Sequence, residues 1–281
     1  MERFRLKSVF TIILTVFLAA DAMPVPRKIA RFRGKDGLVS YGLVDGETVR
    51  RLRGGFPAVL QGRFDAEGGA FLKDVQLLPP VEPTKIVNFG WTYPAHAREV
   101  GGQPDRKEPL VFLKPPSCLV ADGEAIVCPG LSNRVEYEGE LALVIGKTAR
   151  NVNAEEAMSF VLGYTCFNDV TARDLTQSDP EYTRGKGFDT FGPLGPWIVT
   201  GIDPKNLRIV TRVNGEVRQD ATTADMRFGI PFLIHYISQV MTLVPGDVVA
   251  TGTPGGSGPV KPGDVVQVEI DGIGRLTNPV R

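Results

Sequence analysis

Alternating apolar and polar residues, interrupted by glycines, characterise the first part of the chain. Residues 28–32 and 39–44 follow this period of two, which is typical of short strands joined by turns. They predict a small β-rich N-terminal lobe over residues 23–80. The proline-rich stretch 78–83 is stiff and prone to turns, so we expect the lobe to join a larger domain, residues 81–281, at this point.

Two segments of the larger domain have helical features. The first begins at Asn153, a favourable N-cap followed by two glutamates in the first turn, and we expect it to end at Gly163. The second covers residues 231–242, where apolar residues recur at helical spacing: Leu233, Tyr236, Ile237, Val240 and Met241. The opposite stripe carries His235, Ser238, Gln239 and Thr242, and His235 is expected at the surface. The rest of the domain is predicted to consist mostly of strands.

Composition agrees with a mainly β protein of the α+β class. In 281 residues there are 32 glycines and 22 prolines, which favour turns and short strands over a helical bundle. Thirty-two basic residues balance 32 acidic ones, which argues against a basic nucleic-acid groove. Two histidines and three cysteines without a C-x-x-C pair exclude a three-histidine zinc site and a zinc ribbon. A metal site would therefore be built mainly from carboxylates, which suit magnesium, manganese or calcium.

Residues 1–22 differ from the rest of the chain. A basic start precedes an uncharged run over residues 8–20 and small residues beyond it, as in a secretory signal peptide. The run is short for a transmembrane helix. The alternative is a start assigned too early, with Met23 as the true first residue, and the protein would then be cytoplasmic rather than exported.

A strand rich in carboxylates is predicted over residues 135–146. Residues two apart on a strand share a face, so Glu138 and Glu140 project together, roughly 7 Å apart at about 3.3 Å per residue. Two carboxylates on one face repel each other unless a cation lies between them. The alternative is an acidic edge that faces solvent, which Glu136 on the same face would extend.

Two further stretches carry groups suited to a site. The apolar run 164–167 predicts a strand that ends at Asn168, which would place Asp169 at a strand end, although Asp169 could also act as a helix N-cap. Lys186 lies between two glycines that let the backbone approach a ligand closely. The glycine-rich stretch 251–258 offers hydroxyls and backbone N–H groups to an anion, but it is not a P-loop.

A histidine and a glutamate lie three residues apart in the stretch 93–99. On a short helix His96 and Glu99 would share a face, and a carboxylate beside an imidazole orients it and raises its basicity. Such a pair suits a base that activates water. An ordinary surface pair on a helix would have the same spacing.

Taken in chain order, these motifs closely resemble those of the fumarylacetoacetate hydrolase family. The likeness covers about residues 83–281, and the first strand at 28–32 also looks like the start of the family's N-terminal lobe. The resemblance implies a distorted, mainly β roll with a few helices, often assembled as a homodimer. Because such chains usually start just before that first strand, it also favours Met23 as the start, and hence a cytoplasmic protein.

The resemblance assigns roles to individual residues. By analogy with the family's E-x-E strand and later aspartate, the ligands of a divalent ion, Mg²⁺ or else Mn²⁺ or Ca²⁺, are Glu138, Glu140 and Asp169. The catalytic residues it implies are His96, Glu99 and Lys186. The implied substrate-binding residues are Lys114, Thr190 and Thr253.

The implied substrate is a small 2-oxo acid, in particular a 2,4-dioxo acid. The reaction is expected to be C–C bond hydrolysis or decarboxylation through a metal-bound enolate, with isomerisation or hydration of a 2-hydroxy-dienoate in aromatic degradation as the alternative. No nucleic-acid or membrane partner is expected. Two positions depart from the family's pattern: Phe89 stands where the animal hydrolase has an extra metal carboxylate, and Ser257 replaces the usual valine.

Two other classes of protein remain open on the residues alone. One is a non-catalytic, metal-stabilised binding module that uses the acidic cluster as a structural calcium site, although the chain has no EF-hand loop. The other is a glycosidase in which Glu138 and Glu140 act as acid and base, since their spacing overlaps the inverting range. Two carboxylates on one strand do not easily flank opposite faces of a sugar, and only two tryptophans are available for stacking.

Overall fold

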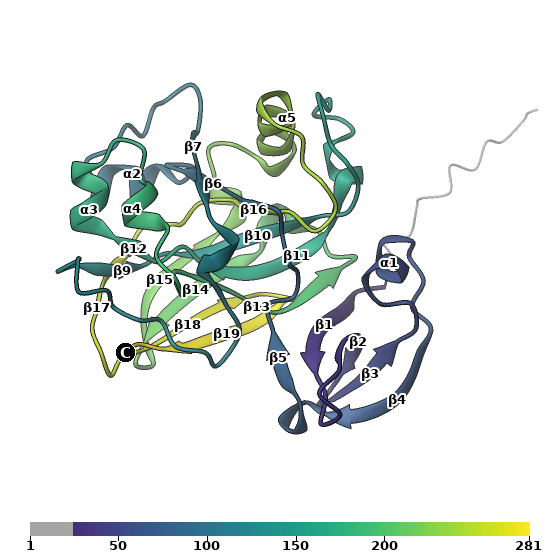
Figure 1. Cartoon of the computed structure of the whole chain (residues 1–281). Helices are drawn as coiled ribbons and strands as arrows, with labels where there is room; N and C mark the ends of the chain where they lie inside the picture. Colours follow the sequence, from purple (N-terminus) through teal and green to yellow (C-terminus); the bar gives the residue numbers. More distant parts are fainter. Residues whose placement is uncertain (1–24) are drawn as a thin grey trace, which may run out of the picture.

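The computed structural model describes residues 25–281, and the predicted signal-like segment or early start at residues 1–22 lies outside them. As predicted, the protein is mainly β with a few helices. Figure 1 shows a small lobe formed by β1–β5 and α1 on one side of the molecule, and the helices α2, α3 and α4 gathered on the other. No helix in residues 25–281 is both long and apolar enough to span a bilayer.

Three sheets contain the strands. The largest has the order β4-β3-β2-β1-β13-β11-β10-β16-β6-β7, with β5 paired to β1 and β8 to β13. Its strands are β1 Arg27–Arg33, β2 Val39–Asp45, β3 Thr48–Leu52, β4 Ala66–Phe71, β5 Gln76–Leu78, β6 Ile86–Gly90, β7 Leu110–Lys114, β8 Leu119–Val120, β10 Gly139–Ile145, β11 Val161–Asn168, β13 Gly192–Thr200 and β16 Val248–Ala250. The second sheet contains β9 Val135–Tyr137, β12 Thr171–Ala172 and β17 Gly258–Val260. The third contains β14 Arg208–Val213, β15 Glu216–Thr222, β18 Val265–Ile270 and β19 Gly274–Pro279.

The helices are short apart from one. The α-helices are α1 Gly55–Leu60, α2 Pro94–Glu99, α3 Arg173–Ser178, α4 Thr183–Lys186 and α5 Ile230–Val240. Single 3₁₀ turns occur at Leu72–Asp74, Pro116–Cys118, Ala157–Phe160, Pro204–Asn206 and Thr223–Asp225.

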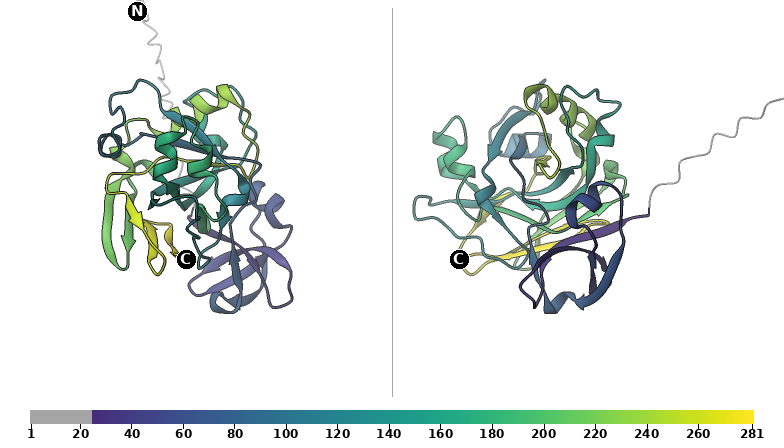
Figure 2. Two further views of the ribbon diagram at one scale, coloured as in Figure 1. Left: turned by 60° about the vertical axis from the view of Figure 1, so that its left-hand side comes forward. Right: turned by 45° about the vertical axis from the view of Figure 1, so that its right-hand side comes forward.

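The predicted strands at 28–32 and 39–44 are β1 and β2, which pair antiparallel. β1 also pairs with β13, so the lobe and the rest of the molecule share one continuous sheet. The right-hand view of Figure 2 shows the lobe projecting from the main body on the side away from α3 and α4.

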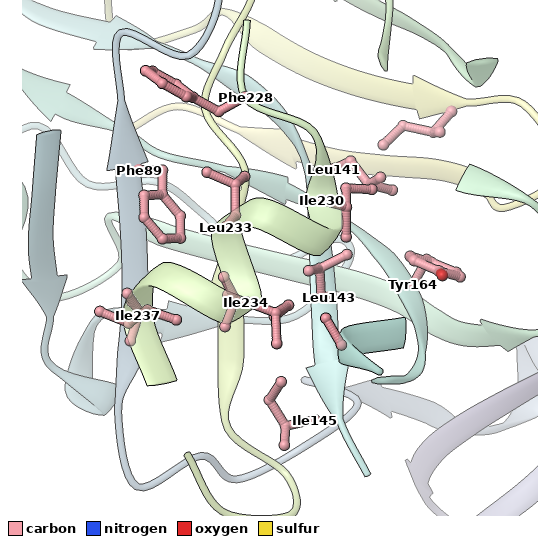
Figure 3. Close-up of a cluster of buried hydrophobic side chains, with 14 of the residues drawn as sticks. Phe89, Leu141, Leu143, Ile145, Tyr164, Phe228, Ile230, Leu233, Ile234 and Ile237 are labelled. Atoms are coloured by element: carbon pink, nitrogen blue, oxygen red, sulfur yellow. The ribbon is translucent and has the colours of Figure 1, made fainter. Parts of the chain in front are cut away.

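The helix predicted over residues 231–242 is α5, and it covers the main core (Figure 3). Leu233 and Ile237 are buried against the face of β10 that carries Leu141 and Leu143. The exact stripe differs from the prediction. Val240 is exposed at the last turn, whereas the polar Ser238 is buried because its hydroxyl accepts a hydrogen bond from the N–H of Val152.

His235 is half-buried rather than fully at the surface. Its Nδ1 lies 2.7 Å from the carbonyl oxygen of Val152. The same turn of α5 therefore holds the chain at Val152 through two polar side chains, those of His235 and Ser238.

The helix predicted from Asn153 to Gly163 is wrong. The structure has turns and a single 3₁₀ turn, Ala157–Phe160, after which β11 begins at Val161. Gly163 lies inside β11, where a Cβ atom would come within 2.5 Å of the carbonyl oxygen of Val199. Pairing of β11 with β10 and β13 outweighs the local N-cap signal.

Candidate metal centre and active site

The chain crosses from the second sheet to the large sheet at Glu138. β9 ends at Tyr137 and β10 begins at Gly139, so Glu138 occupies the link between them. Its N–H donates to Oδ1 of Asn168 at 2.9 Å, and its carbonyl accepts from the N–H of Asp169 at 2.8 Å. These bonds hold the link against the end of β11. β11 ends at Asn168, as predicted from the apolar run 164–167.

Glycine is required at the break because the space beside it is filled. A Cβ atom on Gly139 would lie 2.1 Å from Oγ1 of Thr211 and 3.2 Å from Oε1 of Gln219. The Gly139 N–H donates to that same Gln219 oxygen at 3.0 Å. The middle residue of the E-x-E motif must therefore be small, and one glutamate lies on each side of it.

Three carboxylates meet at this point. Carboxylate oxygens of Glu138, Glu140 and Asp169 all lie within 4.8 Å of one another, and all three side chains are buried. Glu140 accepts one hydrogen bond, from the N–H of Gly252 at 2.9 Å. The acidic strand is thus not a solvent-facing edge, and Asp169 is not a helix N-cap, because α3 begins later, at Arg173.

Two buried lysines and a partly buried arginine surround the carboxylates. Nζ of Lys186 donates to Glu138 at 2.8 Å and to Asp169 at 2.6 Å. Nζ of Lys114 donates to the other oxygen of Asp169 at 2.6 Å. Arg173 donates to both Glu138 and Glu136.

These charges act unequally on the acidic groups. Burial, together with the negative charges of Asp169 and Glu138, raises the pKa of Glu140 well above its usual value. Burial acts in the same direction on Glu138, but the cations of Lys186 and Arg173 outweigh it and hold its pKa below the usual range. Glu140 is therefore the carboxylate with least cationic compensation, which is the place where a further cation would stabilise the site most.

The donor set fits a hard divalent ion. Three buried carboxylates supply only oxygen ligands, which Mg²⁺ and Mn²⁺ accept, and no histidine or cysteine belongs to the cluster found among residues 25–281. Phe89, at the position where the animal hydrolase has an extra carboxylate, is fully buried and lines the same cavity with an apolar ring. The triad would hold the ion without a fourth acidic side chain from that position.

His96 points at the triad from α2. Its Nε2 lies 3.7 Å from Oε1 of Glu138, and its Nδ1 has no hydrogen-bond partner among the described residues. Burial lowers the pKa of His96, and the opposing effect of Glu138 does not restore it. The imidazole is therefore neutral at pH 7 and can accept a proton.

Glu99 lies near His96 but is bonded elsewhere. Its Oε2 is 4.0 Å from Nδ1 of His96, too far for a hydrogen bond, and its side chain is 47% exposed. Both carboxylate oxygens accept from the N–H of Gly256, at 3.0 and 2.8 Å. Glu99 therefore fastens α2 to the glycine-rich stretch 251–258 in this structure.

A cavity of about 230 Å³ opens beside the triad. Three of the predicted functional residues outside the triad line this cavity: His96, Lys186 and Thr253. Lys114 does not line it, because it lies behind Asp169, to which its Nζ donates. Thr253 donates from Oγ1 to the carbonyl of Gly139 at 2.9 Å. Thr190 does not line the cavity, and its hydroxyl accepts from the N–H of Val127 at 2.9 Å.

Two residues of the site were not predicted. Arg173 lines the cavity, and its only sequence signal is its place four residues after Asp169. Gln219 comes from β15 in the third sheet, and its amide donates to Thr253 and Pro254, each at 2.8 Å, while accepting from Gly139. No local pattern around Gln219 indicates this role, because its partners lie at least 34 residues away.

Two known family models match this chain. Residues 85–281 match the model described as fumarylacetoacetate (FAA) hydrolase C-terminal, and residues 27–80 match that described as Rv2993c-like, N-terminal. The chain belongs to the fumarylacetoacetate hydrolase family. The resemblance predicted from the motifs is thereby confirmed.

Relatives of this family member include enzymes of more than one type. The 4-hydroxyphenylacetate degradation bifunctional isomerase/decarboxylase of Salmonella dublin is 45% identical over 84% of this chain and 55% of its own length. The crystal structure of 5-carboxymethyl-2-hydroxymuconate delta-isomerase from Mycobacterium smegmatis is 40% identical, covers 90% of this chain and 98% of that one, and gives a TM-score of 0.82. Fumarylpyruvate hydrolase from Pseudomonas aeruginosa, solved with Mn²⁺ and pyruvate, is 33% identical over 73% of this chain and 91% of that one, with a TM-score of 0.68.

Proposed function

We propose that the chain is a divalent-metal-dependent enzyme that acts on 2-oxo acids, in particular 2,4-dioxo acids, by C–C bond hydrolysis or decarboxylation. The observation that carries this proposal is the buried triad of Glu138, Glu140 and Asp169, which opens on a cavity also lined by Lys186 and His96. A purely structural ion site would have no need of a neutral, buried imidazole beside it.

The chemistry of the proposed reaction needs a carbonyl to be polarised and a proton to be moved. A divalent ion held by the triad would supply the Lewis acid that polarises the keto group of the substrate. Lys186 places a buried ammonium beside the same carboxylates, where it opposes negative charge that develops on the substrate oxygen. Asp169 and Glu138 keep the pKa of Lys186 raised against the effect of burial, so this group stays charged.

His96 is the group placed to move the proton. Its neutral ring can take a proton from water in a hydrolase, and its free Nδ1 leaves one nitrogen for a further partner. Glu99 could become that partner if it exchanged its bond to Gly256 for one to His96, which is 4.0 Å away. Arg173 holds Glu138 from the other side and fixes the direction of its carboxylate.

Isomerisation of a 2-hydroxy-dienoate is the second candidate. It is favoured by the printed names of two relatives, an isomerase/decarboxylase and a delta-isomerase, and it needs the same stabilised enolate. Proton transfer along such an enol would use His96 or Lys186 without an attacking water. Product analysis separates the two candidates, because isomerisation leaves the carbon count of the substrate unchanged.

The test is loss of ultraviolet absorbance of 2,4-dioxo acids and oxaloacetate, with Mg²⁺ or Mn²⁺ and then with EDTA. We expect metal-dependent turnover in the wild type and none in Glu138→Ala, with both proteins shown to be folded by circular dichroism. Turnover that survives EDTA, or an unchanged rate in Glu138→Ala, would refute the proposal. Metal binding without turnover of these acids or of 2-hydroxy-dienoates would favour the metal-stabilised binding module.

A further inference from the structure

Every cationic side chain that lines the site cavity already faces a carboxylate. The lining carries two permanent cations, Lys186 and Arg173, and one titratable ring, His96, among the residues that the structure describes. Lys186 is bonded to Glu138 and Asp169, while Arg173 is bonded to Glu136 and Glu138. His96 also faces Glu138, at 3.7 Å.

These groups gather at the triad, so they serve the end of the substrate that carries the 2-oxo acid. Arg173 reaches the two carboxylates through different nitrogens, Nε to Glu136 and Nη2 to Glu138. Lys186 lies within hydrogen-bond distance of two of the three triad carboxylates. A second anionic group, at the far end of a substrate, would need a different cation.

The rest of the cavity wall is uncharged. Its apolar part is formed by Phe89, Trp91, Val100, Leu110, Phe112 and Tyr182. Phe112 and Tyr182 meet edge to face, with ring centroids 5.8 Å apart. The remaining polar side chains of the wall are neutral: Thr176, Gln177 and Thr253.

We infer that the cavity selects 2-oxo acids whose distal group is uncharged and apolar, and discriminates against a second, distal carboxylate. The inference rests on the proposed function and narrows its substrate class to monocarboxylic 2,4-dioxo acids. A distal carboxylate would lose water on entering the apolar wall and would gain no cation in return. A distal alkyl or aromatic group would instead bury its surface against Trp91, Leu110 and Phe112.

One arginine, Arg106, lies next to a residue of the cavity wall without lining the cavity itself. The guanidinium of Arg106 lies 5.3 Å from the ring centroid of Trp91, and its Nε donates to the carbonyl of Glu108 at 3.1 Å. Arg106 does not line the cavity, and Trp91 does. The inference therefore requires that replacing Arg106 leave the preference between neutral and charged tails in place.

The test compares substrates that differ only in the distal group. The set is 2,4-dioxoheptanoate, 2,4-dioxoheptanedioate and the distal methyl ester of the latter, assayed with Mn²⁺ at equal ionic strength. We expect kcat/KM to be about 100-fold higher for the monocarboxylate than for the dicarboxylate, which corresponds to about 2.7 kcal/mol. The ester should restore most of the loss, because it keeps the length and removes the charge.

A variant that supplies the missing cation sharpens the test. Val100→Lys adds an ammonium to the wall, and Val100→Met adds a chain of similar length without charge. We expect the ratio of neutral to charged substrate to fall at least about tenfold in Val100→Lys relative to Val100→Met. An equal ratio in the two variants would overturn the inference.

Other outcomes also decide the question. A wild type that turns over both acids within about threefold overturns the inference and leaves the proposed function standing. A loss of dicarboxylate turnover in Arg106→Gln, with the monocarboxylate unaffected, overturns it as well, because Arg106 would then be the distal partner.

Absence of turnover would count against the proposed function, and binding would then decide the inference. Calorimetry of the Mn²⁺-loaded protein with the same two acids should show tighter binding of the monocarboxylate. Equal affinities, or binding of neither acid, would overturn the inference.

Discussion

Two buried carboxylates in this molecule are treated very differently by their surroundings. Asp247, between α5 and β16, is fully buried and accepts hydrogen bonds from the N–H groups of Thr84, Lys85 and Val244 and from the Thr84 hydroxyl. The Lys85 ammonium completes its surroundings. Glu140 is equally buried, but it accepts one N–H and faces two other carboxylates.

The difference separates a carboxylate that holds the fold from one that is available for chemistry. Asp247 ties the start of β6 to the turn before β16, two strands that pair in parallel, and has little capacity left for another partner. Glu140 has unused acceptor capacity and unbalanced negative charge in a cavity. Burial alone therefore does not mark a functional acid; the number of donors and the sign of the nearby charges do.

The largest effect should follow from replacing Glu140. Glu140→Gln keeps the shape of the side chain but removes one of three charged ligands, so we expect kcat/KM to fall by about 1,000-fold or more at saturating metal. The same variant should be more stable than the metal-free wild type, because it removes repulsion from Glu138 and Asp169. Steady-state kinetics and urea denaturation of EDTA-treated protein measure the two effects.

Glu136→Gln is the matched control for that variant. Glu136 is also buried and lies on the same stretch of chain, but its carboxylate is paired with Arg134 and Arg173 outside the triad. We expect an activity loss of about tenfold, through looser positioning of Arg173. Equal losses in Glu136→Gln and Glu140→Gln would show that the triad has no special role.

Replacing Asp247 should have the opposite profile. In Asp247→Asn the new amide nitrogen faces N–H donors and the Lys85 ammonium, so we expect a loss of about 3 kcal/mol in the free energy of unfolding. Activity per folded molecule should stay within about twofold of the wild type, since Asp247 does not line the cavity. Urea denaturation followed by activity normalised to folded protein tests both, and a loss of activity without a loss of stability would contradict the assignment.

Metal addition should stabilise the folded protein through Glu140 and independently of Asp247. Mn²⁺ at 100 times its dissociation constant should raise the free energy of unfolding by about 2.7 kcal/mol if it binds only the folded state. We expect the gain in the wild type and in Asp247→Asn, but a much smaller one in Glu140→Gln. Thermal unfolding with and without EDTA measures it, and a full gain in Glu140→Gln would place the ion elsewhere.

Local patterns in the sequence were sufficient for the elements that hold the triad. The strand at 164–167 is part of β11, and the helix at 231–242 corresponds to α5. Two details differ: the predicted strand 135–146 is broken at Glu138, and Val240 of the predicted apolar stripe is exposed. The helix predicted from Asn153 failed because strand pairing to β10 and β13 is decided by residues far along the chain. The role of Gln219 was not predicted for the same reason, because its partners Gly139, Thr253 and Pro254 are distant in the sequence.

The balance of charges in the site could not be predicted from the sequence either. Spacing predicted that Glu138 and Glu140 repel each other, but it could not show that Lys186 and Arg173 compensate Glu138 and leave Glu140 exposed to its neighbours' charge. Likewise the i, i+3 spacing of His96 and Glu99 is present on α2, while the Glu99 carboxylate accepts from the N–H of Gly256 in the glycine-rich stretch 251–258. Such pairings arise from loops that meet only in the folded chain.

The smallest effect concerns a carboxylate of intermediate kind. Asp122 is partly buried and accepts one hydrogen bond, from the N–H of Thr277 at 2.7 Å, and burial raises its pKa above the usual 3.8. A carboxyl whose pKa is raised by folding contributes stability that is present below its unfolded pKa and is lost as the pH rises through the folded one. Asp122→Asn avoids that loss and can still accept from Thr277, so we expect it to match the wild type near pH 4 and to be more stable by a few tenths of a kcal/mol at pH 7. Urea denaturation at the two pH values measures the difference, and a variant less stable than the wild type at pH 7 would show that the single N–H donor already makes Asp122 a structural acid like Asp247.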